Sequence, residues 1–151
     1  MCKAGVDAYV DVTRDEAKTQ AESMYSGNSE IKATTELISS YAWDTALNFI
    51  CQTNTAGYTL ATTTDDAYAN IGTSNKTQTG AYTEDNYSNI HDLLGNCREW
   101  TTEYSRGNGT PCVYVGGHYI TSGSCAASRN GDLSTSDSLA YISFRSQMYV
   151  E

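Results

Sequence analysis

The chain has 151 residues, a net charge of −9 and a hydrophobic fraction of 39%. This length suits one domain that buries its own core. The charge disfavours a nucleic-acid or anionic-membrane partner, because phosphate binding needs clustered basic residues and the chain has only nine lysines and arginines. No apolar stretch reaches the length of a membrane-spanning helix, and residues 1–20 lack the blocks of a signal peptide. We therefore expect a single domain over residues 1–151, without membrane insertion.

Two helices are predicted in the N-terminal third. Thr13 and Glu16 form a capping box, in which each residue satisfies a free backbone N–H of the other at the start of a helix. Gly27 is expected to stop this first helix. A second helix is predicted from about Ser40 to Gln52, because its apolar residues recur at spacings of three and four and form one face.

Beyond the helices the pattern changes. Residues 53–90 are rich in Thr, Ala, Asn and Tyr with weak periodicity, which predicts a long, partly ordered loop with one short strand. Short β segments follow, separated by turns rich in Gly, Ser and Asn: Arg98–Tyr104, Cys112–Gly116, Ser124–Arg129 and Tyr141–Phe144. The expected fold class is α+β, with two N-terminal helices and a small antiparallel sheet carrying long loops.

The five cysteines form no C-x-x-C pair and no zinc spacing. Such a scattered, odd-numbered set is typical of free thiols, several of them buried. A Cys97–Cys112 or a Cys112–Cys125 disulfide remains an open alternative.

Four fragments resemble motifs of a known family. Leu94–Thr101 reads L-G-N-C-R-E-W-T and resembles the G-N-x-x-E-W-T signature of the formylglycine-generating enzyme family, a branch of the C-type lectin fold. Val115–Tyr119, Ala126–Arg129 and Ser143–Arg145 resemble its R-G-G-x-[WY], A-x-R and G-F-R motifs, in the same order. The resemblance covers residues 89–145, and Tyr41–Asp44 on the second helix fits more loosely. The chain has Val115 where the family has Arg, and Ser143 where it has Gly.

The resemblance does not extend to the family's chemistry. Formylglycine-generating enzymes hold copper with two cysteines just after the Gly-Gly motif, whereas residues 118–124 contain no cysteine. One thiol cannot form a two-thiolate site. The related iron-dependent enzymes need a cluster of histidines, and the chain has only His91 and His118, far apart in sequence. We expect no enzymatic activity, with an oxidase of this type as the less favoured alternative.

A structural calcium ion is a further implication of the resemblance. The family holds calcium around the G-N-x-x-E-W turn, and the matching positions are Asp92, Gly95, Cys97 and Glu99. Carboxylates and carbonyls suit such a hard cation. Alternatively, the two acidic residues bond the backbone of the turn. Calcium-dependent sugar binding is not expected, because the single proline, Pro111, has no neighbouring carboxylate or amide; sugar binding by stacking on tyrosines stays open.

One stretch of the chain lacks five residue types. From Val113 to Arg145 there is no Lys, Glu, Gln, Met or Trp, although the first 112 residues contain 18 of them. Some proteins that share the C-type lectin fold are variable proteins of diversity-generating retroelements. Their reverse transcriptase mutates template adenines, so that AAC codons become other codons ending in C, and such codons never encode these five types. The same missing set implies a variable region over residues 113–145.

Three clusters without periodicity interrupt the apparent scaffold of this region: His118–Thr121, Asn130–Leu133 and Leu139–Tyr141. Their mixture of aromatic, apolar and polar residues suits a binding face. The candidate ligand-binding residues are Tyr114, His118, Tyr119, Ile120, Thr121, Asn130, Asp132, Leu133, Leu139 and Tyr141. The expected partner is an unknown protein or cell-surface ligand, with the cell surface or a virion as the expected location. The alternative is a calcium-stabilised adhesion or structural module that is not diversified.

Overall fold

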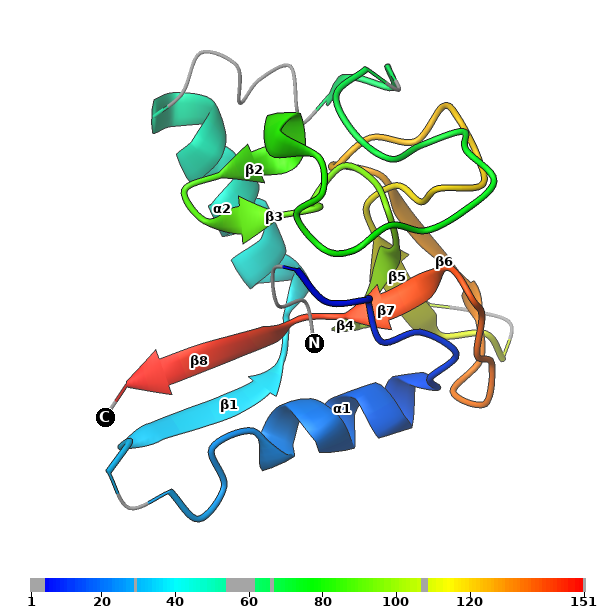
Figure 1. Ribbon diagram of the computed structural model, residues 1–151. Helices are drawn as coiled ribbons and strands as arrows, with labels where there is room; N and C mark the ends of the chain where they lie inside the picture. The colour runs from blue at the N-terminus through cyan, green and yellow to red at the C-terminus, as the bar shows by residue number, and fades with distance from the viewer. Residues whose placement is uncertain (1–4, 29, 54–61, 66, 107–108, 151) are drawn as a thin grey trace.

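The computed structural model describes residues 5–28, 30–53, 62–65, 67–106 and 109–150. Within these ranges, two helices, one 3-10 turn and eight strands form an α+β arrangement, which confirms the predicted fold class (Figure 1). In chain order they are α1 Arg14–Ser23, β1 Ala33–Leu37, α2 Ser40–Thr53, η1 Thr83–Asp85, β2 Asn86–Tyr87, β3 Ile90–His91, β4 Arg98–Tyr104, β5 Cys112–Val115, β6 Arg129–Leu133, β7 Ile142–Phe144 and β8 Ser146–Val150. No helix in these described ranges is both long and apolar enough to cross a membrane.

Both predicted helices are confirmed, and the capping box forms as expected. The Glu16 amide donates to Thr13 Oγ1 over 3.2 Å, and the Thr13 amide donates to Glu16 Oε2 over 2.8 Å. Helix α1 ends at Ser23, earlier than Gly27, because the backbone of Met24 turns to an extended conformation. Helix α2 occupies nearly the predicted range.

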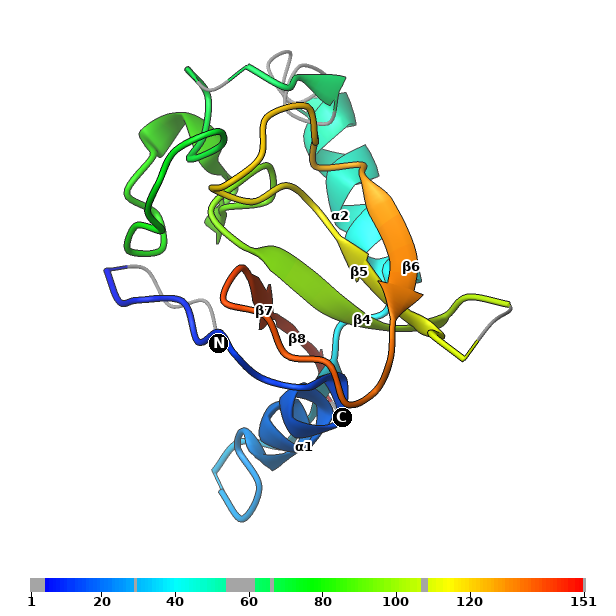
Figure 2. The same ribbon diagram turned by 90° about the vertical axis from the view of Figure 1, so that its right-hand side faces the viewer.

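The central sheet has the strand order β6-β5-β4-β7. Strand β4 pairs antiparallel with β5 but parallel with β7, so the prediction of an antiparallel sheet is wrong for this pair. The parallel pair arises because β7 follows a long connection from β6 that brings the chain back beside β4 in the same direction (Figure 2). Trp100 thereby pairs with Tyr114 on one side and Phe144 on the other.

One predicted strand is misplaced. Residues 124–128 form a turn rather than the first part of a strand, and β6 begins only at Arg129. Ser128 closes this turn, because its hydroxyl accepts from the Cys125 amide over 2.8 Å and its own amide donates to the Cys125 carbonyl over 2.9 Å. The predicted loop 53–90 contains η1, β2 and the first residue of β3, while its residues 54–61 and 66 lie outside the described ranges.

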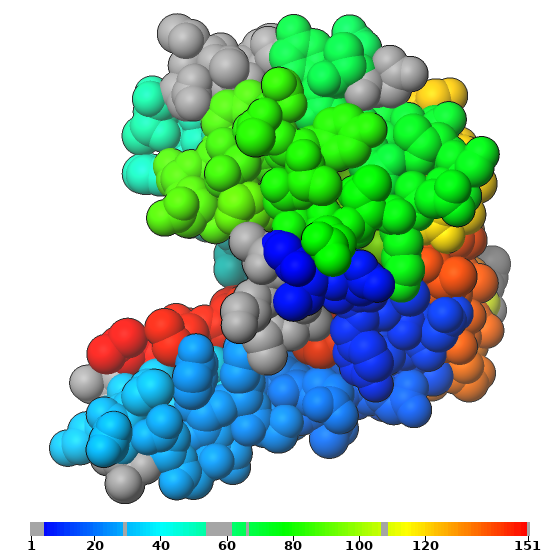
Figure 3. Space-filling view, in the orientation of Figure 1, coloured from blue at the N-terminus to red at the C-terminus, as the bar shows by residue number. Residues whose placement is uncertain are grey.

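Strands β1 and β8 form a separate two-stranded sheet that the sequence did not predict. They pair antiparallel from Ala33 opposite Val150 to Leu37 opposite Ser146. This sheet extends from the lower part of the molecule in Figure 1. Figure 3 shows the surface hollowed between β8 and the segments around β2 and β3.

Two apolar clusters lie on the two faces of the central sheet, because neighbouring residues of a strand point to opposite sides. Tyr114 and Val115 of β5 illustrate this, since each belongs to a different cluster. The cluster beneath α1 consists of Val12, Ala17, Ala21, Leu37, Trp100, Cys112, Tyr114, Ile142 and Phe144. The cluster beneath α2 consists of Ile38, Trp43, Leu47, Ile50, Ala69, Leu93, Leu94, Val115 and Ala126.

Candidate functional site

The fragments that resemble family motifs contact one another. Glu99 of β4 is almost fully buried, and its two carboxylate oxygens accept from Nε and Nη2 of Arg145 over 2.8 and 2.7 Å. Arg145 Nη2 also donates to the carbonyl oxygen of His91 over 2.8 Å. A buried carboxylate needs such a partner, because removal from water would otherwise cost several kcal/mol. The E-W and F-R fragments are therefore two halves of one buried ion pair.

The Gly-Gly fragment packs against the G-N turn. A Cβ atom on Gly117 would lie 2.2 Å from the Leu94 carbonyl oxygen, to which the Gly117 amide donates over 2.9 Å. Gly116 has a φ of +81°, in the left-handed region that favours glycine. The two glycines therefore serve different needs, one for close approach and one for backbone conformation.

The side chains of Asp92 and Glu99, two of the predicted calcium ligands, bond other groups of the protein. Asp92 accepts from the amide of Gly80 over 3.2 Å and from Asn96 Nδ2 over 3.0 Å, so the alternative of backbone bonding holds in part. Glu99 pairs with Arg145 instead, and the Gly95 carbonyl accepts from the Cys97 amide over 2.8 Å. Within the described ranges, no group of three or more His, Cys, Asp or Glu side chains could hold a metal ion. Calcium stays a prediction that these contacts do not support.

Asp85, which the sequence did not single out, supports the same turn. Its carboxylate accepts from the amides of Leu94 and Gly95 over 3.0 and 3.1 Å. Burial, reinforced by the charge of Asp92, raises the pKa of Asp85 to about 8, although both amides and Arg145 act in the opposite direction. Burial likewise raises the pKa of Asp92. Two buried carboxyl groups thus lie behind the G-N turn.

The predicted ligand-binding residues differ widely in exposure. Tyr114 and His118 are buried, with 4% and 5% of their surfaces exposed, so they offer little contact area. Ile120 is 50% exposed, and Thr121 and Asp132 are exposed as well. The partly exposed members are Tyr119, Asn130, Leu133, Leu139 and Tyr141.

The structure brings four of these residues together around Arg98. The Tyr114 hydroxyl lies 2.6 Å from Asp132 Oδ1, and the Arg98 guanidinium lies 5.1 Å from the centre of the Tyr114 ring. The Tyr141 carbonyl accepts from the Arg98 amide over 2.9 Å, and the His118 ring meets the Tyr141 ring edge to face, with 4.5 Å between centres. Arg98 was not predicted as a site residue, yet it occupies a variable position of the G-N-x-x-E-W-T signature and points to the same face as Trp100.

Burial shifts the pKa values of this cluster and leaves one of its polar groups without a hydrogen bond among the described residues. Burial raises the pKa of Tyr114 to about 12, and its bond to Asp132 adds to the effect. Burial lowers the pKa of His118, with a smaller contribution from the charge of Arg98, so the imidazole is neutral near pH 7. Arg98 Nη2 donates to Ser124 Oγ over 3.1 Å, whereas its buried Nε has no hydrogen-bond partner among the described residues.

The remaining predicted residues have other contacts. Leu133 and Leu139 pack against the apolar cluster beneath α1, to which Tyr114 belongs and against which Tyr141 also packs. The backbone of Tyr119 bonds to two other segments: its amide donates to the Asn96 carbonyl, and its carbonyl accepts from the Thr73 amide. The predicted residues thus comprise a polar group at Arg98, two leucines on the adjoining apolar cluster, and Tyr119, whose backbone bonds to Asn96 and Thr73.

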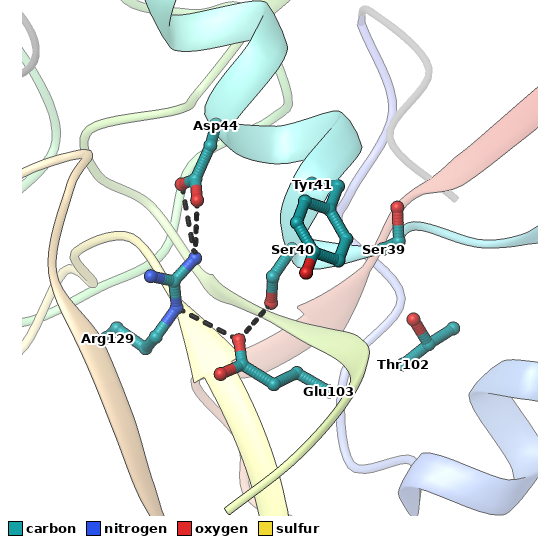
Figure 4. Close-up of a pocket in the computed structure, with 7 residues that line it drawn as sticks. All are labelled: Ser39, Ser40, Tyr41, Asp44, Thr102, Glu103 and Arg129. Atoms are coloured by element: carbon teal, nitrogen blue, oxygen red, sulfur yellow. Dashed lines mark hydrogen bonds and ion pairs between the residues drawn. The ribbon is translucent and has the colours of Figure 1, made fainter.

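A polar pocket of about 430 Å³ lies on the α2 side of the sheet. Ser40, Tyr41 and Asp44 come from the first turns of α2, Glu103 from the end of β4, and Arg129 from the start of β6 (Figure 4). Ser39 and Thr102 complete its lining. In the sequence, the only indication of this pocket was that Asp44 and Arg129, which carry opposite charges, belong to two of the motif fragments.

Arg129 is the centre of this pocket. Its Nη2 lies 3.0 Å from Asp44 Oδ2, and its Nε lies 3.1 Å from Glu103 Oε2 (Figure 4). The Ser40 hydroxyl also bonds Glu103 Oε2. All three charged side chains are more than a third exposed, so the network is open to a ligand.

The four described cysteines, Cys51, Cys97, Cys112 and Cys125, form no disulfide with one another. Neither of the two disulfides that the sequence left open therefore forms. This agrees with the prediction of mainly free cysteines. Cys2 lies outside the described residues.

No protein-family model matches the chain, and no curated protein matches its sequence. Among solved structures, the crystal structure of CarF is similar, with a TM-score of 0.69 at 14% sequence identity. The similarity covers 94% of this chain and 67% of CarF. At this identity the likeness shows a related fold and nothing of activity or ligand.

Proposed function

We propose that this protein is a ligand-binding domain of the C-type lectin type, related to the formylglycine-generating enzymes in fold but not in chemistry. It would be the variable protein of a diversity-generating retroelement and bind a protein or cell-surface ligand. The absence of five residue types from Val113 to Arg145 carries this proposal. The contacts between motif fragments support the proposal, because they separate buried scaffold residues from exposed positions that can be substituted.

The scaffold side of this division rests on buried contacts. Glu99 with Arg145, and Gly117 against Leu94, involve residues that cannot change without loss of packing. The other side rests on Ile120, Thr121 and Ala140, whose exposed side chains leave room for substitution. A protein diversified by mutation needs both kinds of position, since most core substitutions destabilise and most surface ones do not.

The proposed contact face is narrower than the sequence suggested. Its exposed part would be Tyr119–Thr121, Asp132 and Ala140–Tyr141, with Arg98 and the buried Tyr114 and His118 as its support. Exposed aromatic and polar side chains on such a framework suit recognition of a protein surface. We assign no catalytic role to these residues.

The DNA that flanks the gene tests the proposal. We expect a reverse-transcriptase gene and a near-repeat of the 3′ coding sequence that carries adenines at the codons for Ile120, Thr121, Asp132 and Ala140. The codons for Glu99, Gly117 and Arg145 should show no adenine differences from the repeat. A genomic neighbourhood without either feature would contradict the assignment and leave a domain that is not diversified.

A further inference from the structure

The pocket around Arg129 lies outside the proposed contact face, and its charges are paired within the protein. Two carboxylates, of Asp44 and Glu103, flank one guanidinium, so the pocket carries a net charge of −1. The two carboxylates would repel an anionic ligand, and Arg129 between them would repel a cationic ligand. A neutral polar ligand would experience neither repulsion.

Both kinds of hydrogen-bonding group are open in this pocket. Arg129 Nη1 is a donor and Glu103 Oε1 an acceptor, and neither makes a hydrogen bond within the described part of the chain. The Thr102 hydroxyl adds a group that can donate or accept. The ion pairs hold the guanidinium and one carboxylate in place, so these groups would lose little freedom on binding. Paired donors and acceptors of this kind suit a ligand with several neighbouring hydroxyl groups.

Tyr41 supplies an aromatic wall. It is 88% exposed, the highest value among the exposed large hydrophobic residues, and it stands beside Ser40 at the edge of the pocket (Figure 4). A tyrosine ring combines an apolar face with a polar hydroxyl and loses little conformational entropy on binding. The C–H face of a sugar ring is a suitable partner for such a surface. The pocket volume of about 430 Å³ also falls within the usual range for small-molecule sites, roughly 300–1,000 Å³.

We propose that this pocket binds one pyranose ring of a saccharide through Arg129, Glu103 and Tyr41, without a metal ion. The ring would stack on Tyr41, and adjacent hydroxyl groups would bond Glu103 Oε1 and Arg129 Nη1. This inference does not depend on diversification of the C-terminal region, so either proposal can fail without the other.

The test is a ¹H–¹⁵N NMR titration of the whole chain in EDTA. The probes are the methyl pyranosides of glucose, galactose, mannose and N-acetylglucosamine. At least one of them should shift the amide signals of Tyr41, Glu103 and Arg129 in a saturable way, with a Kd on the order of 1 mM, as expected for one small ring with few contacts.

Variants of the pocket sharpen the result. Tyr41→Ala removes an exposed ring without disturbing the core and should weaken binding by about tenfold, as should Glu103→Gln. Phe49→Ala is the matched control, because this exposed aromatic residue lies on the same helix outside the pocket; it should leave the affinity unchanged. Unfolding midpoints of all three variants establish that the fold is intact.

Any of three outcomes would overturn the proposal. The first is that none of the four pyranosides gives saturable shifts, and the second is that Tyr41→Ala binds as tightly as the unmodified protein. The third is that the shifted signals belong to residues away from the pocket. Nα-acetyl-lysine methylamide serves as a cationic probe in a parallel titration. Binding of this probe in the absence of pyranoside binding would assign the pocket to a basic side chain of a protein partner instead.

Discussion

At the scale of single residues, buried charge explains why the motif fragments take their particular form. Glu99 has 2% of its side chain exposed and depends on Arg145, which is 17% exposed. Removing one partner of such a pair leaves the other charge buried and costs about 3–5 kcal/mol. The exposed pair of Lys18 and Glu22 on α1 has no such role, because pairs of this kind contribute about 0–1 kcal/mol. Sequence position alone does not distinguish these two pairs, whereas burial does.

Asp85 leads to a prediction about pH. Its pKa of about 8 in the folded protein stands against about 3.9 in an unfolded chain. The folded state therefore keeps a proton that the unfolded state has lost, and the free energy of unfolding falls as pH rises from about 4 to 8. We expect a loss of about 2–5 kcal/mol between pH 5 and 9, measured by urea denaturation in EDTA.

Asp85→Asn should flatten this pH dependence, because an amide keeps an acceptor for the Leu94 amide but carries no charge. A smaller slope of the same sign should remain from Asp92, whose pKa is also raised. Glu84→Gln, at an exposed neighbouring position, is the control and should keep the original slope. An unchanged slope in Asp85→Asn would show that another group titrates in this range.

At the scale of elements, the sequence predicted those that local signals determine. The Thr13–Glu16 capping box fixed the start of α1, and β4 occupies its predicted range of Arg98–Tyr104. Strand β1 was missed, because Ala33–Leu37 is polar and becomes a strand only through its pairing with β8, more than a hundred residues away. Strand β6 was misplaced for a related reason. Its residues Arg129–Leu133 contain Gly and Asp and are held by their pairing with β5, including the bond from Tyr114 to Asp132.

The contact of the Gly-Gly segment with the G-N turn gives a prediction at the same scale. Gly117→Ala would place a methyl group 2.2 Å from a backbone oxygen that cannot move without breaking the turn. We expect a loss of about 3 kcal/mol or more in the free energy of unfolding, or failure to fold. Gly123→Ala is the matched control. It has no atom within 4 Å of the added group but a φ of +91°, so it should cost only about 1 kcal/mol. Equal losses at the two glycines would refute the steric explanation.

At the scale of the whole molecule, the candidate site was predictable in part. The three clusters of predicted contact residues were read from composition, and four of the ten residues meet around Arg98. The burial of Tyr114 and His118 was not predicted, because it depends on segments that are distant in the sequence: Tyr114 packs against Trp100, and His118 packs against Tyr141. The pocket at Arg129 was not foreseeable either, because α2, β4 and β6 supply its walls from distant parts of the chain.

The division into a fixed scaffold and a tolerant face gives the last prediction. A triple variant with Ile120→Ser, Thr121→Asn and Ala140→Asp changes only exposed side chains. Each change should alter stability by about 0.5 kcal/mol or less, so the Tm should shift by no more than about 5 °C. Ile142→Ser, two residues from Ala140 but fully buried, should lower the Tm by about 10 °C or more, since it leaves a cavity and buries an unpaired hydroxyl group. Differential scanning calorimetry of both variants decides the matter. If the Tm of the triple variant falls as far as that of Ile142→Ser, the exposed residues contribute to the stability of the fold. These positions would then not form a face that tolerates mutation.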